Sequence, residues 1–269
     1  MIGLGLAVGT FGTIVGAGGG FVLVPVLLLI YPERDPKVIT AMSLFVVTLN
    51  AISGSFAYAR QRRIDYWSGL WFGLATLPGA VAGALVVAYI PRRTFDAIFG
   101  VTLVSIGLYL ALRSGVQAIQ RPVTGWGVVS RSIGDISGPR FVYSYQLWKG
   151  LAISLGVGFL SSLLGIGGGV IHVPVMVTVL HFPVHIATAT SQFVLSFMSA
   201  QGTAVHFWTG TLGWDEPLEQ AVLLAVGAVP GAQLGAFLAR RLPAITIMRV
   251  LAGALILVGV RLGLKAAGV

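Results

Sequence analysis

Long apolar runs separated by short polar loops occupy most of the chain. A transmembrane helix needs roughly 20 mostly apolar residues to cross a hydrocarbon core about 30 Å thick. Six runs approach or exceed this length, and each predicts a single span: 38–59, 66–91, 97–112, 185–207, 220–239 and 244–265. Two more apolar segments, 1–30 and 150–180, are each broken by a glycine cluster. We expect an all-α polytopic membrane protein, because the strands of a membrane barrel alternate apolar and polar residues and these runs do not.

The order of these segments repeats, so that each half has one glycine-broken segment followed by three spans. Gly16–Pro25 (GAGGGFVLVP) recurs as Gly165–Pro174 (GIGGGVIHVP), and Thr40–Val46 returns as Thr188–Val194. Self-similarity in the same order indicates an internal duplication. The chain therefore divides into a first transmembrane repeat (1–112), a cytoplasmic linker (113–149) and a second transmembrane repeat (150–269).

How the glycine-broken segments lie decides the relative orientation of the repeats. A segment that crosses once gives parallel repeats, whereas a re-entrant hairpin leaves three crossings in each repeat and inverts them. The arms beside each glycine cluster are shorter than a full span. Inversion also places the acidic loop at Asp215 opposite the linker and the basic loop at Arg60–Arg63, although it leaves Arg92 on the outer side. These observations favour inverted repeats, and parallel repeats stay open.

Composition and charge narrow the class of protein. Hydrophobic residues make up 56% of the chain and charged residues only 9%, whereas about a quarter of the residues in soluble domains are charged. The net charge of +9 comes from cations in short loops, which indicates membrane topology and not nucleic-acid binding. The chain has no cysteine, and its intramembrane histidines have no acidic or sulfur companion. We expect no nucleic acid, metal or cofactor, and the sequence is compatible with a homo-oligomer.

The two glycine clusters predict an anion site. Each glycine costs a helix roughly 1 kcal/mol relative to alanine, and irregular backbone at membrane depth persists only inside protein or beside a polar cavity. Free backbone N–H groups and the positive end of the following helix attract anions. The candidate substrate-binding glycines are Gly18, Gly19, Gly20, Gly167, Gly168 and Gly169. For the scattered glycines, close helix packing is the better interpretation.

The paired motif, GAGGGFVLVP in the first half and GIGGGVIHVP in the second, resembles the duplicated signature of the sulfite exporter TauE/SafE family of membrane permeases. The resemblance covers essentially the whole chain. It implies a bacterial or archaeal inner-membrane transporter for a small sulfur-containing anion, such as sulfite or an organosulfonate. The family's motif maps onto Gly16, Gly18, Gly19, Gly20 and Pro25, and onto Gly165, Gly167, Gly168, Gly169 and Pro174. His172 stands where the first copy has Leu23, so the halves are not equivalent.

Polar side chains within the spans are further site candidates, because a membrane makes them costly. We predict that six of them donate hydrogen bonds to the substrate: Thr40, Ser43, Thr188, Thr190, Ser191 and Gln192. His172 is a candidate substrate contact or proton relay. For Asn50, Gln201 and Gln233 an interhelical hydrogen bond is the better interpretation. All eight Asp and Glu residues lie in loops or at span edges, so no intramembrane carboxylate is expected to carry a coupling ion.

These features predict a permease for a small anion, bound between the two repeats, with no catalytic residues, and the resemblance implies an exporter whose anion contains sulfur. A permease for another small organic anion is an alternative. A further alternative is an intramembrane hydrolase with a nucleophile in Ser53-Gly54-Ser55 and His206 as base, but nothing in the sequence requires their contact. A scaffold protein would not need matched glycine clusters, and the lack of intramembrane carboxylates argues against a cation permease.

Overall fold

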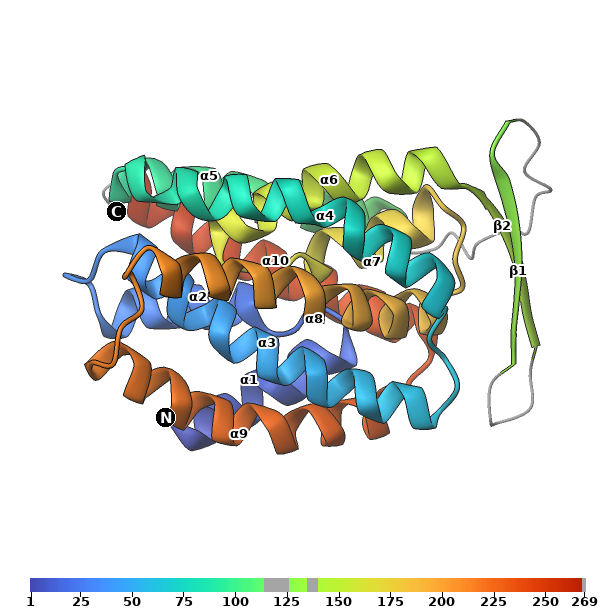
Figure 1. Cartoon of the computed structure of the whole chain (residues 1–269), viewed down its shortest axis with the longest axis horizontal. Coiled ribbons are helices and arrows are strands. Elements are labelled where there is room, and N and C mark those ends of the chain that lie inside the picture. Colours follow the sequence, from blue (N-terminus) through green and yellow to red (C-terminus); the bar gives the residue numbers. More distant parts are fainter. Residues whose placement is uncertain (114–125, 135–139, 268–269) are drawn as a thin grey trace.

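Helices follow one another along the chain in the same order in each half (Figure 1). The computed structural model describes residues 1–113, 126–134 and 140–267. In the first half these are α1 (Ile2–Ile14), α2 (Gly20–Ile30), α3 (Pro36–Arg60), α4 (Tyr66–Val86), the short 3₁₀ helix η1 (Val87–Tyr89) and α5 (Arg92–Arg113). In the second half they are α6 (Leu147–Leu164), α7 (Gly169–Thr178), α8 (Val184–Trp208), α9 (Glu216–Ala239) and α10 (Ala244–Ala267).

The prediction of an all-α polytopic membrane protein is confirmed. Within the described ranges, six helices are long and apolar enough to cross a membrane: α3, α4 with η1, α5, α6, α9 and α10. At 25 residues α8 is as long as α3, but it is not one of these six helices, and its first turns contain the predicted site residues Thr188, Thr190, Ser191 and Gln192. The six uninterrupted spans expected from the sequence coincide with α3, α4, α5, α8, α9 and α10 to within a few residues.

Sequence-local signals explain where several helices begin. The Asp35 carboxylate caps α3 by accepting the Lys37 N–H at 2.9 Å, and Pro36 occupies the first helical position. The Asp65 carboxylate caps α4 by accepting the Ser68 N–H at 3.2 Å. In α9, Glu216 and Glu219 lie in the first turn, where the helix dipole favours negative charge.

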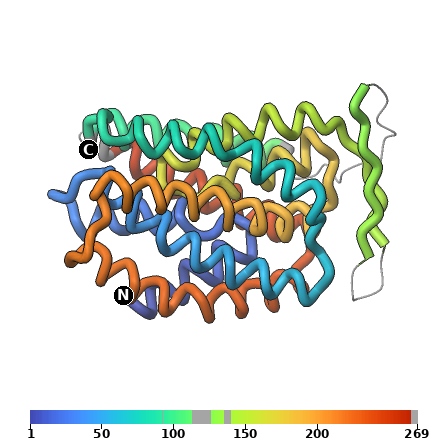
Figure 2. Tube along the Cα trace, in the orientation of Figure 1, coloured from blue at the N-terminus to red at the C-terminus, as the bar shows by residue number. Residues whose placement is uncertain are grey.

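The two glycine-broken segments each fold back on themselves. At 13 and 11 residues, α1 and α2 are shorter than a span, and they turn at the first glycine cluster, so that their outer ends lie on the same side of the bundle as the N-terminus (Figures 1 and 2). The α6 and α7 helices turn at the second cluster, with their outer ends on the opposite side. The α3 and α8 helices run in opposite directions (Figure 1).

Helices of one half pack on helices of the other. The α1 helix packs against α9, the matching α6 packs against α4, α3 packs against α8, and α5 packs against α10. Small residues permit the approach: a Cβ atom on Gly231 would lie 2.5 Å from the Leu6 carbonyl oxygen, and one on the matching Gly79 would overlap the Leu155 carbonyl. The packing interpretation of these scattered glycines is confirmed.

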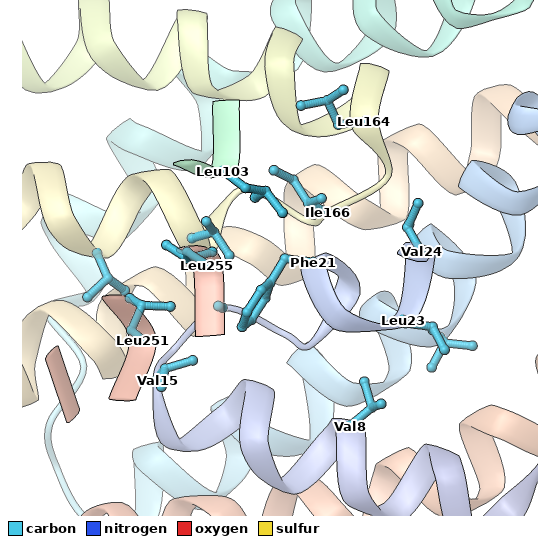
Figure 3. Close-up of a cluster of buried hydrophobic side chains, with 14 of the residues drawn as sticks. Val8, Val15, Phe21, Leu23, Val24, Leu103, Leu164, Ile166, Leu251 and Leu255 are labelled. Carbon is cyan, nitrogen blue, oxygen red and sulfur yellow. The ribbon is translucent and has the colours of Figure 1, made fainter. Parts of the chain in front are cut away.

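The buried core surrounds the two glycine turns with side chains from both halves (Figure 3). Phe21, at the start of α2, and Ile166, within the second turn, are both fully buried in this cluster. Leu103 of α5 and Leu251 of α10 complete it from the outer pair of helices. The turns are therefore held inside the bundle and away from its ends.

An antiparallel hairpin lies across one end of the bundle (Figure 1). Strand β1 (Val128–Gly134) pairs with β2 (Arg140–Gln146), in a register that places Val128 opposite Gln146 and Gly134 opposite Arg140. Tyr143 and Tyr145, two residues apart on one face of β2, are buried. The sequence predicts only a polar linker over 113–149, so the hairpin is an addition to the expected fold, and α6 begins at Leu147 within that range.

Candidate functional site

The two glycine turns require residues without a side chain. Six glycines of the turns have positive φ: Gly16 (73°), Gly18 (69°), Gly19 (84°), Gly165 (68°), Gly167 (74°) and Gly168 (67°). Other L-amino acids are strained in this conformation because their Cβ atom crowds the backbone. The duplicated motif therefore encodes two turns of the same shape.

The turns lie against each other at the centre of the bundle. A Cβ atom on Gly20 would lie 2.8 Å from the Gly165 carbonyl oxygen, and one on Gly169 would overlap the Gly16 carbonyl. Gly18 and Gly167 both pack against the side chains of Val47 on α3 and Leu195 on α8. All residues of both turns are buried. The predicted site glycines of the two halves thus form one close-packed centre.

Matched serines fasten each turn to the other half. Ser43 of the first half donates to the Gly165 carbonyl oxygen at 2.7 Å, and Ser191 of the second half donates to the Gly16 carbonyl oxygen at 3.1 Å. The two bonds are equivalent by the internal repeat. In this arrangement both hydroxyls are occupied by backbone and not free for a substrate.

The helices that follow the turns begin with unpaired backbone donors. Gly19 and Gly168 are the N-cap residues of α2 and α7, and neither helix has a side-chain cap. Among the described residues, the N–H groups of Gly19, Phe21, Gly168 and Val170 have no hydrogen-bond acceptor. Such amides, with the positive end of a helix dipole, are the groups that bind anions at helix starts.

The matched threonines have different partners. Thr40 is fully buried, and its Oγ1 has no hydrogen-bond partner in the described structure. Thr188, its counterpart, donates to the Val184 carbonyl of its own helix at 2.7 Å. Thr190 accepts the Asp65 N–H at 3.0 Å. Of these three predicted substrate contacts, Thr40 is the one whose hydroxyl has neither a donor nor an acceptor among the described residues.

Gln192 belongs to a hydrogen-bonded network around Asn50. The Asn50 amide donates to the carbonyl oxygens of Gly9 and Ala228, each at 3.1 Å. Its oxygen accepts from Thr13 Oγ1 and Gln192 Nε2, again at 3.1 Å. The interhelical interpretation is confirmed for Asn50, and also for Gln233, which donates to the Ser53 carbonyl oxygen at 2.7 Å.

His172 is buried between side chains of α6 and α4. Its Nε2 is 3.1 Å from Ser154 Oγ, and the Phe72 ring packs edge-on with its centroid 5.7 Å away. Within the described ranges, no group of three or more His, Asp or Glu residues could hold a metal ion. The hydrolase alternative gains no support, since Ser55 Oγ and His206 Nε2 both lack a hydrogen-bond partner and so are not bonded to each other.

Two serines on α6 were not recognised from the sequence. Ser161 and Ser162 are fully buried, and their hydroxyls have no partner in the part of the chain that the structure describes. Ser161 Oγ lies 3.0 Å from the position that a Cβ atom would take on Gly168. The available signal was a pair of hydroxyl residues in an apolar arm directly before the second motif.

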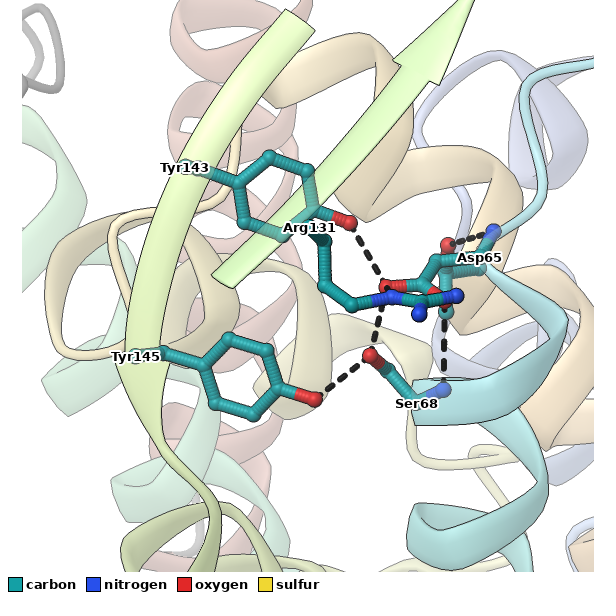
Figure 4. Close-up of polar contacts among 6 residues, drawn as sticks. Asp65, Ser68, Arg131, Tyr143 and Tyr145 are labelled. Atoms are coloured by element: carbon teal, nitrogen blue, oxygen red, sulfur yellow. Dashed lines mark hydrogen bonds and ion pairs between the residues drawn. The ribbon is translucent and has the colours of Figure 1, made fainter. Parts of the chain in front are cut away.

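A polar cluster, here called the clasp, ties the hairpin to the first half (Figure 4). It consists of Asp65, Ser68, Arg131, Tyr143 and Tyr145. The Asp65 carboxylate is fully buried and forms an ion pair with Arg131 at 2.9 Å. Tyr143 donates to the same carboxylate at 2.7 Å, and Ser68 bonds both Asp65 and Tyr145. The sequence places Asp65 at a span edge, as observed, but gives no sign that it is buried.

The clasp stabilises the charged form of Asp65. Burial alone would raise the pKa of this carboxyl group, but hydrogen bonds from Arg131, Ser68 and Tyr143 outweigh burial and hold the pKa below its usual value. The hydrogen bond to Asp65 raises the pKa of Arg131. Burial raises the pKa of Tyr145 to about 12. The ion pair therefore persists at neutral pH, with both tyrosines as neutral donors.

Comparison with known proteins agrees with the membrane architecture. The sequence pattern of the family described as "Sulfite exporter TauE/SafE" matches residues 1–262. The "Probable membrane transporter protein YunE" of Bacillus subtilis (strain 168) is 35% identical over 265 residues, which cover 96% of this chain and 94% of that protein. The "Probable membrane transporter protein MJ0441" of Methanocaldococcus jannaschii is 26% identical over 248 residues, which cover 86% of this chain and 82% of that protein.

No solved structure matches the chain. The family pattern nevertheless extends over both glycine turns and the hairpin between the halves, and the relatives are named as membrane transporters, not enzymes. The chain is a multi-pass membrane protein, and it belongs to the sulfite exporter TauE/SafE family of membrane transporters.

Proposed function

We propose that the protein is a permease of the cell inner membrane that exports a small sulfur-containing anion, such as sulfite or an organosulfonate. The observation that carries the proposal is the meeting of two buried glycine turns whose helix starts have unpaired N–H groups. Bare amides at a helix start bind oxyanions without introducing a fixed charge. Thr40 adds a free hydroxyl beside the second turn.

The arrangement of the halves suits alternating access. We take the repeats, 1–112 and 150–269, to be inverted, with the α1–α2 and α6–α7 hairpins entering from opposite membrane faces and the linker 113–149 in the cytoplasm. Transporters built from inverted repeats bind substrate where broken helices meet, and they open by moving one repeat against the other. The serine bonds to Gly16 and Gly165 join the halves when the centre is closed. Breaking them would free two donors for the passing anion.

Export needs no coupled ion. A membrane potential that is negative inside favours outward movement of a singly charged anion by roughly 2.3 kcal/mol per 100 mV, which is enough for a gradient of more than tenfold. The buried carboxylate of Asp65 is held in the clasp by Arg131 and two hydroxyls. It is therefore engaged in structure and not presented to the turns as an ion carrier.

Transport in proteoliposomes tests the proposal. Vesicles loaded with sulfite or methanesulfonate should release the anion through the wild-type protein, and faster when the imposed potential is negative inside. Thr40→Val, which removes a free hydroxyl at constant shape, should weaken apparent affinity about tenfold, as expected for a lost hydrogen bond to a charged group. Thr188→Val is the matched control, because that hydroxyl is already bonded within its own helix. Release of neither anion by wild-type protein would contradict the proposal.

A further inference from the structure

The second glycine turn has a hydroxyl group that the first turn lacks. Ser161 Oγ lies 3.0 Å from the Cβ position of Gly168, the N-cap of α7. The residue that matches Ser161 in the first repeat is Gly12, and there the backbone of Gly19 fills the same space. The start of α2 is thus closed by backbone, whereas the start of α7 faces a side-chain donor.

The Ser161 hydroxyl differs from the buried hydroxyls that are hydrogen-bonded. Ser199 donates to the Leu195 carbonyl of its own helix at 2.6 Å, and Ser43 and Ser191 donate across to the glycine turns. Ser161 is fully buried, yet its Oγ has no partner in the described structure. A buried hydroxyl without a partner carries a desolvation cost, and a bound ligand that accepts its hydrogen bond would remove that cost.

Backbone donors without an acceptor lie in the same turn as Gly168. The N–H groups of Gly168 and Val170 have no acceptor among the described residues, and α7 is a helix of 10 residues whose positive end lies there. The Met198 side chain covers Gly168. Its sulfur lies 3.1 Å from the Cβ position of Gly168, and its terminal methyl group lies closer still. Methionine is unbranched and changes rotamer readily, so its side chain is a movable cover.

We propose that Ser161 and the amino end of α7 form an anion subsite in the second half, to which the first half has no equivalent. The inference rests on the proposed function and deepens it. The subsite would bind the oxygen atoms on one side of a singly charged oxyanion such as a sulfonate. The groups that form it, a hydroxyl, two amides and a thioether, are all neutral. Dehydrating a doubly charged anion costs far more than dehydrating a singly charged one, and neutral donors compensate less of that cost.

Binding to purified protein in detergent tests the subsite, with methanesulfonate and sulfate as the probe anions. We expect wild-type protein to bind methanesulfonate more tightly than sulfate by calorimetry. Ser161→Ala should bind methanesulfonate about tenfold more weakly, the loss of one hydrogen bond to a charged group. Ser199→Ala, which removes a hydroxyl bonded within its own helix, should leave the affinity unchanged.

Thermal unfolding without any anion supplies a second measurement. Ser161→Ala should unfold at the same temperature as wild type or a higher one, because it removes a buried hydroxyl that had no partner. A lower unfolding temperature with unchanged affinity would show a structural role and overturn the subsite. Unchanged affinity at any unfolding temperature would also overturn it, as would tighter binding of sulfate than of methanesulfonate. Failure of wild-type protein to bind either probe would contradict the anion permease itself.

Discussion

The two halves share one architecture but differ in how their buried polar groups are satisfied. In the first half, Asn50 links Thr13 and two backbone carbonyls, and Tyr58 donates to the Thr13 carbonyl at 2.7 Å. The residues at the matching positions of the second half are Met198, Ser162 and His206. Ser162 Oγ and His206 Nε2 have no partner within the described ranges. For Ser162 the reason is that Met198 offers no amide oxygen of the kind that accepts the Thr13 hydroxyl in the first half.

This difference indicates a division of labour after duplication. Each buried polar group left unpaired costs about 1–3 kcal/mol, and such groups in native proteins call for an explanation, often a functional one. In the first half, Asn50, Thr13 and Tyr58 are all hydrogen-bonded, and we infer that this half is the rigid support. The second half keeps unpaired donors beside Gly168, where we place the substrate. Variants at matched positions of the two halves test this difference.

Asn50→Leu should have the largest effect. It removes the four hydrogen bonds that Asn50 makes with Gly9, Ala228, Thr13 and Gln192, at roughly 1 kcal/mol each, or about 4 kcal/mol in total. Met198→Leu, at the matching position, conserves volume and should cost less than about 1.5 kcal/mol. Unfolding in detergent by a denaturant measures both. Equal losses would show that the halves are equally supported.

The start of α4 and the start of α9 should respond differently to loss of charge. Asp65 is buried in the clasp, whereas Asp215, at the matching N-cap, is exposed and makes no side-chain cap bond. Asp65→Asn should loosen the hairpin by about 3 kcal/mol, the upper range for hydrogen bonds to a charged group. Asp215→Asn should have almost no effect. The rate at which a protease cleaves the hairpin compares the two variants.

The pH dependence of the clasp follows from the same carboxyl group. Because the folded pKa of Asp65 lies below its unfolded value, the stabilisation is fully present above the unfolded pKa of about 3.9 and is lost as pH falls through the folded pKa. The hairpin should therefore stay docked from neutral pH down to about pH 4 and loosen only below it. Trp67, beside Arg131, is a fluorescent reporter. Loosening between pH 7 and pH 5 would contradict the assignment.

Gly168→Ala should destabilise the second turn by about 2 kcal/mol, the usual cost of a residue other than glycine in left-handed backbone. The new Cβ atom would also meet the Met198 methyl group. Gly156→Ala is the control, since Gly156 is helical, exposed and has nothing near its Cβ position. It should stabilise by roughly 0.5–1 kcal/mol. The thermal unfolding temperature should fall for Gly168→Ala and rise for Gly156→Ala.

The smallest changes in the free energy of unfolding should be opposite in sign at the matched residues Thr13 and Ser162. Thr13→Ala removes a bonded hydroxyl and should destabilise by about 1 kcal/mol, whereas Ser162→Ala removes an unpaired one and should stabilise by up to about 1 kcal/mol. Destabilisation by both would mean that Ser162 has a partner, such as an ordered water molecule.

Much of the fold could be predicted because the signals are local. The apolar runs set the spans to within a few residues, and the glycine triplets gave the turns, because a bilayer imposes span length and glycine alone tolerates positive φ. The hairpin was missed, although the alternation that buries Tyr143 and Tyr145 is a strand signal.

The site was predicted less completely, because hydrogen-bond partners depend on how the halves pack. Ser43 and Thr40 look alike in sequence, yet Ser43 bonds Gly165 and Thr40 is free. The ion pair of Asp65 and Arg131 joins residues 66 positions apart on a span edge and a linker. Neither pairing has a local pattern that could reveal it.

Asp65 connects the hairpin at the end of the bundle to the helices inside it. Its carboxylate holds Arg131 of the hairpin, while its N–H donates to Thr190, whose neighbour Ser191 holds the Gly16 carbonyl. The ion pair, the two hydrogen bonds and the adjacent residues Thr190 and Ser191 therefore form one continuous connection from the hairpin at the end of the bundle to the backbone of the first glycine turn.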